Sequence, residues 1–529
     1  MARVSDSEDE DSHPQASSSK SKTIYGLLHL PNAREGDSFN VWPTDNQNPL
    51  AGFEFDKLPT ELLVEIFRHA RADSLYDAHN EKYRYPVALS HVCHHWRTVT
   101  IAAPTLWSDI RVLEYHREAR EATCIYLERS KTCPIYFTWF TEPGQLHNDA
   151  PAVVEHVIIP AAERWERITL IAGTKIVSDS FLTAIQSLDF PILRGIEISC
   201  VPSMELFPPT STLCHSTPLL RRCRFRNFSS LPSLPSNLVV LDCVFLALGS
   251  TVFDLDPFLQ FLPHVAHSLE HLRFEPPSTS GIHFTPGTPK IPLENLKSLL
   301  IADSHAIMNH ILAPNLTSFV AYHSFEADAK EAAQMFEGFS APKLRSIQFH
   351  QSPLLPLLAT HNLPSMFPQL ESVLLSSCTD ESAFVPLLAD TFSHLKELTI
   401  SDMTIWTSLQ AAIEKRFKNG DKSLRKIQLP KGDATVVITP HLRQWLPAQG
   451  IELVLYEPGE LPRSTPEFQD EPFDEEDRLF LEITMRGSEW GDVEDYDFDL
   501  WEAGVMSYLN YEDPSFDDEE GYEGEFHEG

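Results

Sequence analysis

The sequence has few cysteines, no long apolar run and no excess of basic residues, and each absence excludes a class of protein. Its eight cysteines are scattered through 529 residues without a Cys-x-x-Cys pair. This usage fits reduced thiols in the cytoplasm or nucleus and not a disulfide framework. No apolar stretch reaches the roughly 18 residues that cross a bilayer, so we expect no transmembrane helix and no membrane partner. The first residues, MARVSDSEDEDS, contain no apolar run, so we expect no secretory signal.

The charge is strongly negative and unevenly distributed. A formal net charge of −35 argues against general binding to nucleic acid or to an anionic membrane. Residues 457–529 alone hold 26 acidic and 3 basic residues, a net charge of −23. Residues 1–52 are rich in Ser, Asp, Glu and Asn. We predict that residues 1–52 and the acidic, aromatic-containing tail 458–529 are disordered, or that the tail folds only on a basic partner.

One short pattern recurs through the middle of the chain: an apolar residue, two residues, an apolar residue, one residue, an apolar residue. The interval between the clear copies is 18 to 31 residues, and its mean, near 26, lies within the range of leucine-rich repeats. Two weaker copies, WSDIRV and PIYFTW, precede the clear ones. The eleven clear copies begin at residues 165, 193, 220, 238, 269, 296, 316, 344, 370, 395 and 424.

The last two apolar positions of each copy are two residues apart, so they lie on one face of a strand. Helix-like pieces follow some copies, as in 256–268 and 331–339. Each unit therefore predicts a strand, a turn and a helical return, and about 11 to 13 such units must stack into a solenoid to bury their apolar faces. The Asn or Cys expected eight residues after the first Leu is mostly missing, with only Cys378 in place. We therefore expect irregular repeats in an α/β fold.

No motif for catalysis or cofactor binding is present. The sequence lacks a Gly-rich phosphate loop, a G-x-S-x-G elbow and a kinase signature, so we expect no enzyme, no catalytic residue and no cofactor. The stretch HVCHHW suggests metal binding at first. However, Val92 stands where a zinc protease has Glu, and on one helix Cys93 would lie about 160° around the axis from both His91 and His95. We expect no metal site, with Cys93 packing beside Val92 and Trp96.

Residues 53–104 have a helical pattern of their own. Pro59 is placed in a first helical turn, and Leu62, Leu63, Ile66 and Phe67 recur at helical spacing after it. A polar insert follows, and then a second stripe predicts one helix that ends at Pro104. The stripe consists of Leu89, Val92, Cys93, Trp96, Val99, Thr100 and Ala103.

This segment resembles the F-box, whose pattern is Leu-Pro, a helix ending in Ile-Phe, a Leu-x-x-Val-Cys-x-x-Trp-Arg helix and a closing Pro-x-Leu-Trp. The insert 71–86 is longer than usual and resembles the variants of fungal, basidiomycete-type F-box proteins with degenerate leucine-rich repeats. The matching residues are Leu58, Pro59, Leu62, Ile66, Phe67, Leu89, Val92, Cys93, Trp96, Arg97, Pro104, Leu106 and Trp107.

The resemblance implies a substrate receptor of a cullin-RING (SCF-type) ubiquitin ligase. The F-box would bind the small Skp-family adaptor, and the repeats would bind a protein substrate. The alternative is a repeat scaffold with no degradative role. Some of the apolar residues must pack internally, and the sequence does not say which. The candidate adaptor contacts are Leu58, Pro59, Leu62, Leu63, Ile66, Phe67, Leu89, Val92, Cys93 and Trp96.

A substrate is expected on the face formed by the residues between the apolar strand positions. These residues are mostly small or neutral, but Arg222, Arg224 and Arg226 alternate along one strand. His271 and Arg273 fall at matching places two repeats later. This arginine cluster is the tentative site for an acidic or phosphorylated segment. A strand neutralised by its neighbours, or docking of the chain's own acidic tail, are the alternatives.

The predicted organisation therefore has four parts. Residues 1–52 form a disordered segment, 53–104 an F-box, 105–457 a degenerate leucine-rich-repeat solenoid and 458–529 an acidic disordered tail.

Overall fold

The structure is a computed structural model of the whole chain. Contacts divide the chain into a unit over Met1–Thr465 and a second over Pro466–Gly529, and all the residues described below belong to the first. They are residues 57–73, 85–113, 119–140, 154–172, 175–200, 213, 216–228, 231–245, 252–276, 282–285, 287–302, 306–322, 339, 341–350, 367–376, 388, 392, 394–400, 406–430 and 440–456. The expected disorder of both ends, the piece 331–338 and most of the insert 71–86 lie outside them.

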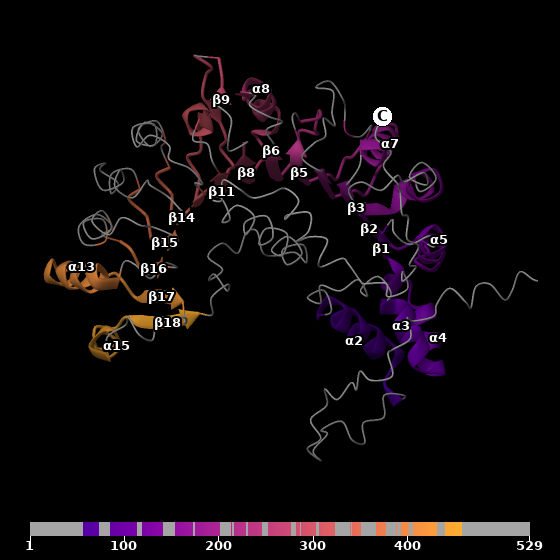
Figure 1. Cartoon of the computed structure of the whole chain (residues 1–529), viewed down its shortest axis with the longest axis horizontal. Coiled ribbons are helices and arrows are strands. Elements are labelled where there is room, and N and C mark those ends of the chain that lie inside the picture. Colours follow the sequence, from indigo (N-terminus) through magenta and orange to yellow (C-terminus); the bar gives the residue numbers. More distant parts are fainter. Residues whose placement is uncertain are drawn as a thin grey trace, which may run out of the picture. The chain divides into compact units, whose positions relative to one another are not determined.

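A parallel sheet of fourteen strands dominates the described part of the chain (Figure 1). Each strand pairs in parallel with the next one along the sheet, which is the order expected when every repeat adds one strand. The strands are β1 Asp109–Leu113, β2 Ile135–Phe140, β3 Trp165–Ala172, β4 Gly195–Cys200, β5 Arg222–Phe228, β6 Val240–Phe245, β8 His271–Glu275, β11 Ser298–Ala302, β13 Ser318–Tyr322, β14 Ser346–His350, β15 Ser372–Ser376, β16 Glu397–Ile400, β17 Lys426–Pro430 and β18 Glu452–Tyr456.

All thirteen copies found in the sequence lie on strands of this sheet, and one further strand, β18, was missed. Leu453 and Leu455 pair with the core residues Ile427 and Leu429 of β17, so they take the apolar strand positions. The place of the first leucine is held by Gly450, whose φ of 80° no leucine adopts readily. The pattern therefore loses its first apolar residue at the end of the sheet.

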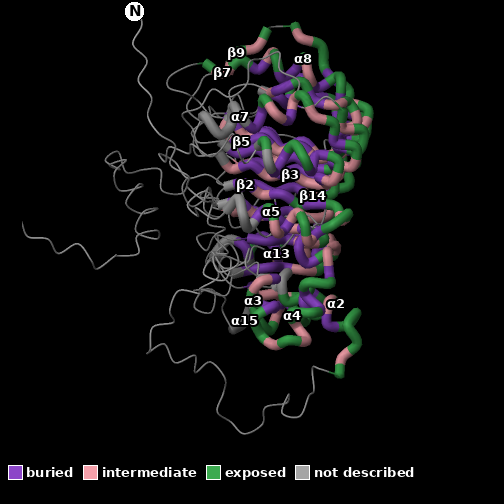
Figure 2. Tube along the Cα trace, turned by 90° about the vertical axis from the view of Figure 1, so that its right-hand side faces the viewer, coloured by how far each residue is buried: buried purple, intermediate pink, exposed green. Residues whose placement is uncertain are grey.

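The three apolar positions of the clear copies form the core. The first residue of each copy is at most 3% exposed, and the fourth and sixth are buried on the same face of the sheet. Truncating one such Leu to Ala typically costs about 2 to 5 kcal/mol. Figure 2 shows the buried residues concentrated in the strands and exposed residues in the turns beside them.

A tight turn leads into seven of the fourteen strands. In seven copies the N–H of the first leucine donates to the carbonyl three residues earlier, as in Leu316 to Ala313 at 3.1 Å and Leu344 to Ala341 at 3.0 Å. Proline often follows that carbonyl residue, where its fixed φ suits the second position of a β-turn. These prolines are Pro191, Pro218, Pro314, Pro342 and Pro368.

A polar ladder replaces the missing Asn or Cys of the repeats. The residue before the first leucine reaches the backbone of the preceding repeat: Asn237 donates to the Pro218 carbonyl at 2.9 Å and Asn315 to that of Glu294 at 2.6 Å. The hydroxyl of Ser423 does the same to Leu395 at 2.9 Å. Neighbouring repeats are thus joined by side chains that satisfy buried or turn carbonyls.

The helices of the repeats lie on the core face of the sheet (Figure 1). On α8, buried Phe258 and Leu262 share one side and face the core. The opposite face, formed by the third and fifth residues of each copy, is called the second face below. The repeat helices are α5 Ala119–Arg129, α7 Lys175–Gln186, α8 Asp256–Val265, α13 Trp406–Lys418 and α15 Pro440–Ala448, with short helical turns η5 Val154–Ile158, η6 Ile159–Arg164 and η7 Ala306–His310. Two short ladders, β7 Phe253–Asp254 with β9 Ile282–His283 and β10 Ile291–Pro292 with β12 Ile311–Leu312, complete the repeats.

Three helices and a helical turn precede the sheet. They are α2 Thr60–Asp73, α3 Tyr85–Val92, α4 His94–Ala102 and η4 Pro104–Trp107. The indole of Trp107 is fully buried, and its Nε1–H donates to the Thr100 carbonyl at 2.8 Å. Tyr126 of α5 packs edge-on against it with ring centroids 5.0 Å apart. Trp107 thus joins α4 to the first repeat. Among the described residues, no helix has the length and apolar content needed to span a membrane.

Candidate functional site

The predicted adaptor contacts on α2 divide into a buried and an exposed set. Leu63 and Phe67 are 0% and 1% exposed, whereas Leu62 and Ile66 are 52% and 42% exposed. Residues four apart share a helix face, so one side of α2 packs inward and the adjacent side presents two apolar side chains to solvent. Only the second pair is available to a partner in this arrangement.

The single helix expected over residues 87–103 is wrong, because the chain breaks at Cys93. This residue is extended, with φ −156° and ψ 171°, and its Sγ accepts a hydrogen bond from the Trp96 N–H at 3.4 Å. Cys93 therefore caps α4 instead of continuing a stripe. Val92 was expected to face the core beside it but is 60% exposed at the end of α3. The angles between Cys93 and the histidines that were worked out for one continuous helix therefore no longer apply.

The remaining contacts mostly support the helices themselves. Leu89 is buried, and half-buried Trp96 stacks at a tilt on Phe67 with ring centroids 4.8 Å apart. Leu58 is partly buried against the core, while Pro59 is exposed and its carbonyl accepts the first helical bond of α2 from Leu63 at 3.1 Å. These residues explain why the segment folds, independently of any partner.

Exposed apolar side chains are concentrated in the three N-terminal helices. Of the nine most exposed large apolar residues in the described part of the chain, four lie between residues 60 and 102: Leu62, Ile66, Val92 and Ile101. Single exposed apolar residues need no explanation, but a concentration on packed helices is typical of an interaction site. Ile101, at 41% exposure, was not predicted, because the expected unbroken helix directed attention to the other side of α4.

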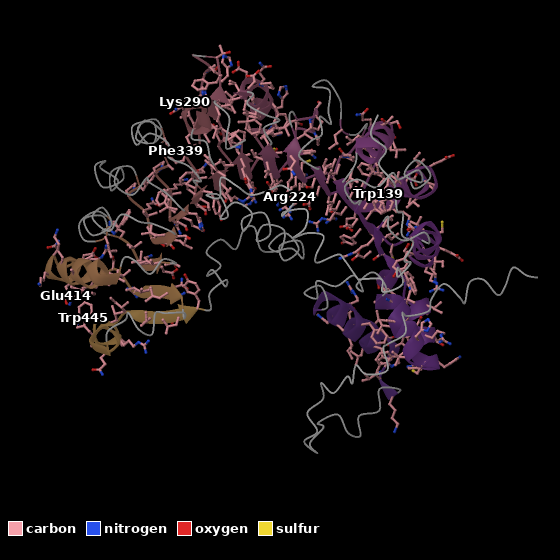
Figure 3. The ribbon with its side chains drawn as sticks, viewed as in Figure 1. Trp139, Arg224, Lys290, Phe339, Glu414 and Trp445 are labelled. Carbon is pink, nitrogen blue, oxygen red and sulfur yellow. The ribbon has the colours of Figure 1, made fainter. Side chains whose placement is uncertain are left out.

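The arginine cluster lies on the second face, as its alternation predicts. Cys223 and Phe225 between the arginines are fully buried in the core. The sheet register places Arg224 between Glu197 of β4 and Asp242 of β6, and Asp242 beside Arg273 of β8. Figure 3 shows Arg224 on the side of the sheet away from the helices.

These side chains form an ion-pair network. Arg224 Nε donates to Asp242 Oδ2 at 2.8 Å, and its Nη1 lies 3.4 Å from Glu197 Oε1. Arg273 Nε lies 3.6 Å from Asp242 Oδ1, and Arg273 Nη2 donates to Glu275 Oε2 at 2.9 Å. Burial alone would raise the pKa of Asp242, but the surrounding arginines outweigh it and lower that pKa. Asp242 is therefore held ionised at the centre of the network.

This network differs from an open basic surface. Arg226 and Arg273 are only 3% and 7% exposed, and three carboxylates offset the arginines locally. The pKa of His271 is lowered, chiefly by burial, which favours its neutral form. The sequence analysis allowed for a strand neutralised by its neighbours but did not identify Glu197 or Glu275, because their positions beside the arginines follow only from the strand register. Substrate binding at Arg222, Arg224, Arg226, His271 and Arg273 stays a prediction.

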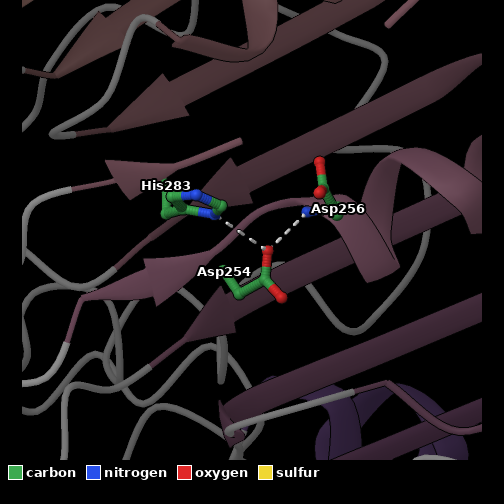
Figure 4. A group of neighbouring side chains, drawn as sticks. All are labelled: Asp254, Asp256 and His283. Carbon is green, nitrogen blue, oxygen red and sulfur yellow. Dashed lines mark hydrogen bonds and ion pairs between the residues drawn. The ribbon is translucent and has the colours of Figure 1, made fainter. Parts of the chain in front are cut away.

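One group of three potential metal ligands occurs within the described residues, and the sequence reading did not single it out. Asp254, Asp256 and His283 place one ligand atom each within 4.8 Å of the others (Figure 4). Hydrogen bonds of the two aspartates hold the local backbone in place. Asp254 accepts from the backbone N–H of Asp256 at 3.1 Å at the start of α8. Asp256 accepts from the N–H of Thr285 at 2.9 Å and from its hydroxyl, which lowers the pKa of Asp256. The group ties β7, α8 and the turn after β9 together.

Comparison with known proteins identifies the repeats. Residues 287–409 match the family model described as At1g61320/AtMIF1, LRR domain. The chain therefore contains leucine-rich repeats, in agreement with the parallel sheet. No curated protein matches the chain. A solved protein from Bacteroides fragilis is similar over 62% of this chain and 76% of its own, at 11% identity and a TM-score of 0.27, which is too low to carry an argument. Leucine-rich repeats are an interaction architecture, so protein–protein interaction is the level of function that the match supports.

Proposed function

We propose that this protein is the substrate receptor of a cullin-RING (SCF-type) ubiquitin ligase. In this proposal α2, α3 and α4 form an F-box that binds a Skp-family adaptor, and the leucine-rich repeats bind a protein substrate. The observation that carries the proposal is the exposure of Leu62, Ile66 and Val92 at positions that match the F-box pattern. Apolar side chains held out on packed helices supply the desolvated anchors that a partner's groove needs.

Other observations are consistent with this role. The covalent chemistry would belong to other subunits, so this chain needs no catalytic group. Cys93, Cys124, Cys133, Cys223 and Cys243 form no disulfide, and Cys223 and Cys243 are fully buried. This fits a reducing compartment, and we place the protein in the cytoplasm, the nucleus or both. The resemblance to fungal F-box proteins belongs to the same proposal.

Co-purification tests the adaptor contact. Tagged wild-type protein should recover a Skp-family adaptor and a cullin from cells, and Leu62→Ala with Ile66→Ala, which changes two exposed side chains, should reduce that recovery. Recovery that is absent for the wild type, or unchanged in the double variant, would contradict this assignment of the F-box surface.

Ubiquitination separates the receptor from a scaffold with no degradative role. With the proteasome blocked, proximity labelling should identify neighbours that carry more ubiquitin when the F-box is intact. If neighbours are recovered but their ubiquitination does not depend on the F-box, the scaffold is the correct function.

A further inference from the structure

A row of charged residues follows the edge of the sheet at which the strands begin, called the leading edge here. Each copy contributes the residue directly after its first leucine or tryptophan. At two places along the row an acidic residue pairs with the base on the next strand: Glu166 Oε1 lies 3.5 Å from Arg194 Nε, and Glu270 pairs with Lys297. Between these pairs lie exposed Arg221, which donates to the Asn237 carbonyl, and uncharged Val239, so this part of the leading edge carries a small positive excess.

The positive excess is larger at β14 to β17. The row there reads Arg345, Glu371, Lys396 and Arg425 on four consecutive strands. Glu371 and Lys396 pair with each other at 2.7 Å. Arg345 and Arg425 flank this pair, are exposed, and have no carboxylate partner among the described residues.

Two lysines in the adjoining turns extend the positive surface. Lys343 is exposed beside Arg345 and donates to the amide oxygen of Asn315 at 2.6 Å, which leaves its charge uncompensated. Lys422 is exposed beside Arg425. The only other described acid in these leading-edge turns, Asp421, pairs with buried Arg416 at 2.6 Å. Lys343, Arg345, Lys396, Lys422 and Arg425 together are named the basic rim.

The dimensions of the basic rim fit an extended polypeptide. Neighbouring strands lie about 4.8 Å apart, so Arg345 and Arg425 are separated by about 14 Å along the edge. An extended chain rises about 3.3 Å per residue and places alternate side chains on one side. A segment of about five residues with acidic groups at alternate positions would therefore reach both arginines. Guanidinium groups bind carboxylate and phosphate in bidentate fashion.

The geometry points to the basic rim as the binding surface for an acidic segment of the protein substrate. This inference rests on the proposed function, because it assigns the chemical class of what the receptor binds. The basic rim differs from the arginine cluster of the second face, in which the arginines already pair with Glu197, Asp242 and Glu275. In a chain of net charge −35, an exposed basic surface favours an acidic partner through complementary charge.

Fluorescence anisotropy with the full-length protein tests the inference. The probe is a labelled peptide of about ten residues that alternates glutamate with serine, used with and without phosphate on the serines. The test variant is Arg345→Gln with Arg425→Gln. The matched control, Arg194→Gln with Arg443→Gln, removes two exposed arginines outside the basic rim and gives the same net charge.

Wild-type protein should bind both peptides at about 20 mM salt and more weakly at about 300 mM, because exposed charges are screened. The test variant should bind about tenfold more weakly at low salt, as expected for two exposed charge contacts, and the control should stay within about twofold of wild type. Equal weakening in both variants, or no binding by the wild type, would overturn the inference. Tighter binding of a DNA duplex that is lost in the same variant would reassign the rim to nucleic acid.

Adaptor binding separates this inference from the proposed function. The rim variant should bind the adaptor as the wild type does, because the exposed residues of α2 and α3 are unchanged. If the wild type binds the peptide at the rim but no adaptor, the ligase role fails and the rim stands. If it binds the adaptor but no peptide, the rim fails and the ligase role stands.

Discussion

Asp242→Ala should destabilise the middle repeats strongly, because it removes the shared carboxylate of a buried ion-pair network. The variant loses the 2.8 Å hydrogen bond from Arg224 and the 3.6 Å ion pair with Arg273. It also leaves Arg226, which is 3% exposed, without the carboxylate that most favours its charged form. Removing one partner of a buried network typically costs about 3 to 5 kcal/mol, since the remaining charges stay buried. We expect a loss of this size in the free energy of unfolding.

Two matched variants show which part of the loss is electrostatic. Asp242→Asn keeps an acceptor for Arg224 but no charge, so it should cost less than Asp242→Ala. Replacing Arg224, Arg226, Asp242 and Arg273 together with Met, Met, Leu and Met should restore much of the stability, because apolar side chains of similar volume often replace a buried ion network at little cost.

Urea unfolding followed by circular dichroism measures the total effect, and hydrogen exchange of β5, β6 and β8 shows whether it is local, as repeat proteins allow. The lowered pKa of Asp242 adds a pH test. Its charge stabilises the fold above the unfolded pKa of about 3.9, and this contribution is lost as the pH falls through the lower folded pKa. Asp242→Asn has no carboxylate at this position, so it should not show this loss of stability at low pH. A change below about 1 kcal/mol in Asp242→Ala, with unchanged exchange, would refute the structural role of the network.

Three further changes test the packing of the repeats. Arg416→Leu should lower the free energy of unfolding in urea by about 3 kcal/mol, because the side chain is 1% exposed and its guanidinium donates to the Leu388 carbonyl at 2.9 Å and to Ser423 Oγ at 2.8 Å. The control Lys418→Leu, at an exposed position of the same helix, should change it by less than about 0.5 kcal/mol. Equal effects of the two would contradict this role. Burial lowers the pKa of His350 to about 4, below the unfolded value of about 6.5, so the wild type should lose up to about 3 kcal/mol as the pH falls from 6.5 to 4, whereas His350→Phe should not. If the free energy of unfolding changes with pH in the same way in the wild type and in His350→Phe, the His350 imidazole is not buried in its neutral form. Asn315→Ala should cost about 1 kcal/mol through the lost 2.6 Å bond to Glu294, and no cost would remove the polar ladder as a stabilising feature.

Much of the repeat architecture could be predicted from the sequence, because each copy carries its own core residues. Leu193, Leu296 and Leu395 are all fully buried, and every copy that was found lies on a strand. The pattern failed only at β18, where Gly450 takes the place of the first leucine. The polar ladder was missed because the search concerned the residue eight positions after the first leucine and not the one directly before it.

The candidate sites were less predictable, because exposure and pairing are decided by residues distant in sequence. Helical spacing placed Leu62 and Leu63 in one apolar stripe, yet only Leu63 packs inward. The end of one helix and the start of the next at Cys93 could not be predicted, because cysteine is not a frequent helix cap and apolar residues recur at helical spacing on both sides of it. Likewise, Glu197 and Glu275 reach the arginine cluster only through strand pairing.

The central claim is that exposed apolar residues of α2 bind a Skp-family adaptor, and calorimetric titration with purified adaptor tests it most directly. The variant is Leu62→Ala with Ile66→Ala, whose side chains are 52% and 42% exposed, so the fold should be retained. The matched control, Leu219→Ala with Ile159→Ala, changes the same residue types at 40% and 43% exposure elsewhere. The account predicts binding by the wild type and the control, and a Kd raised at least tenfold, about 1.4 kcal/mol or more, in the α2 variant. No binding by the wild type, or the same Kd in all three proteins, would contradict it.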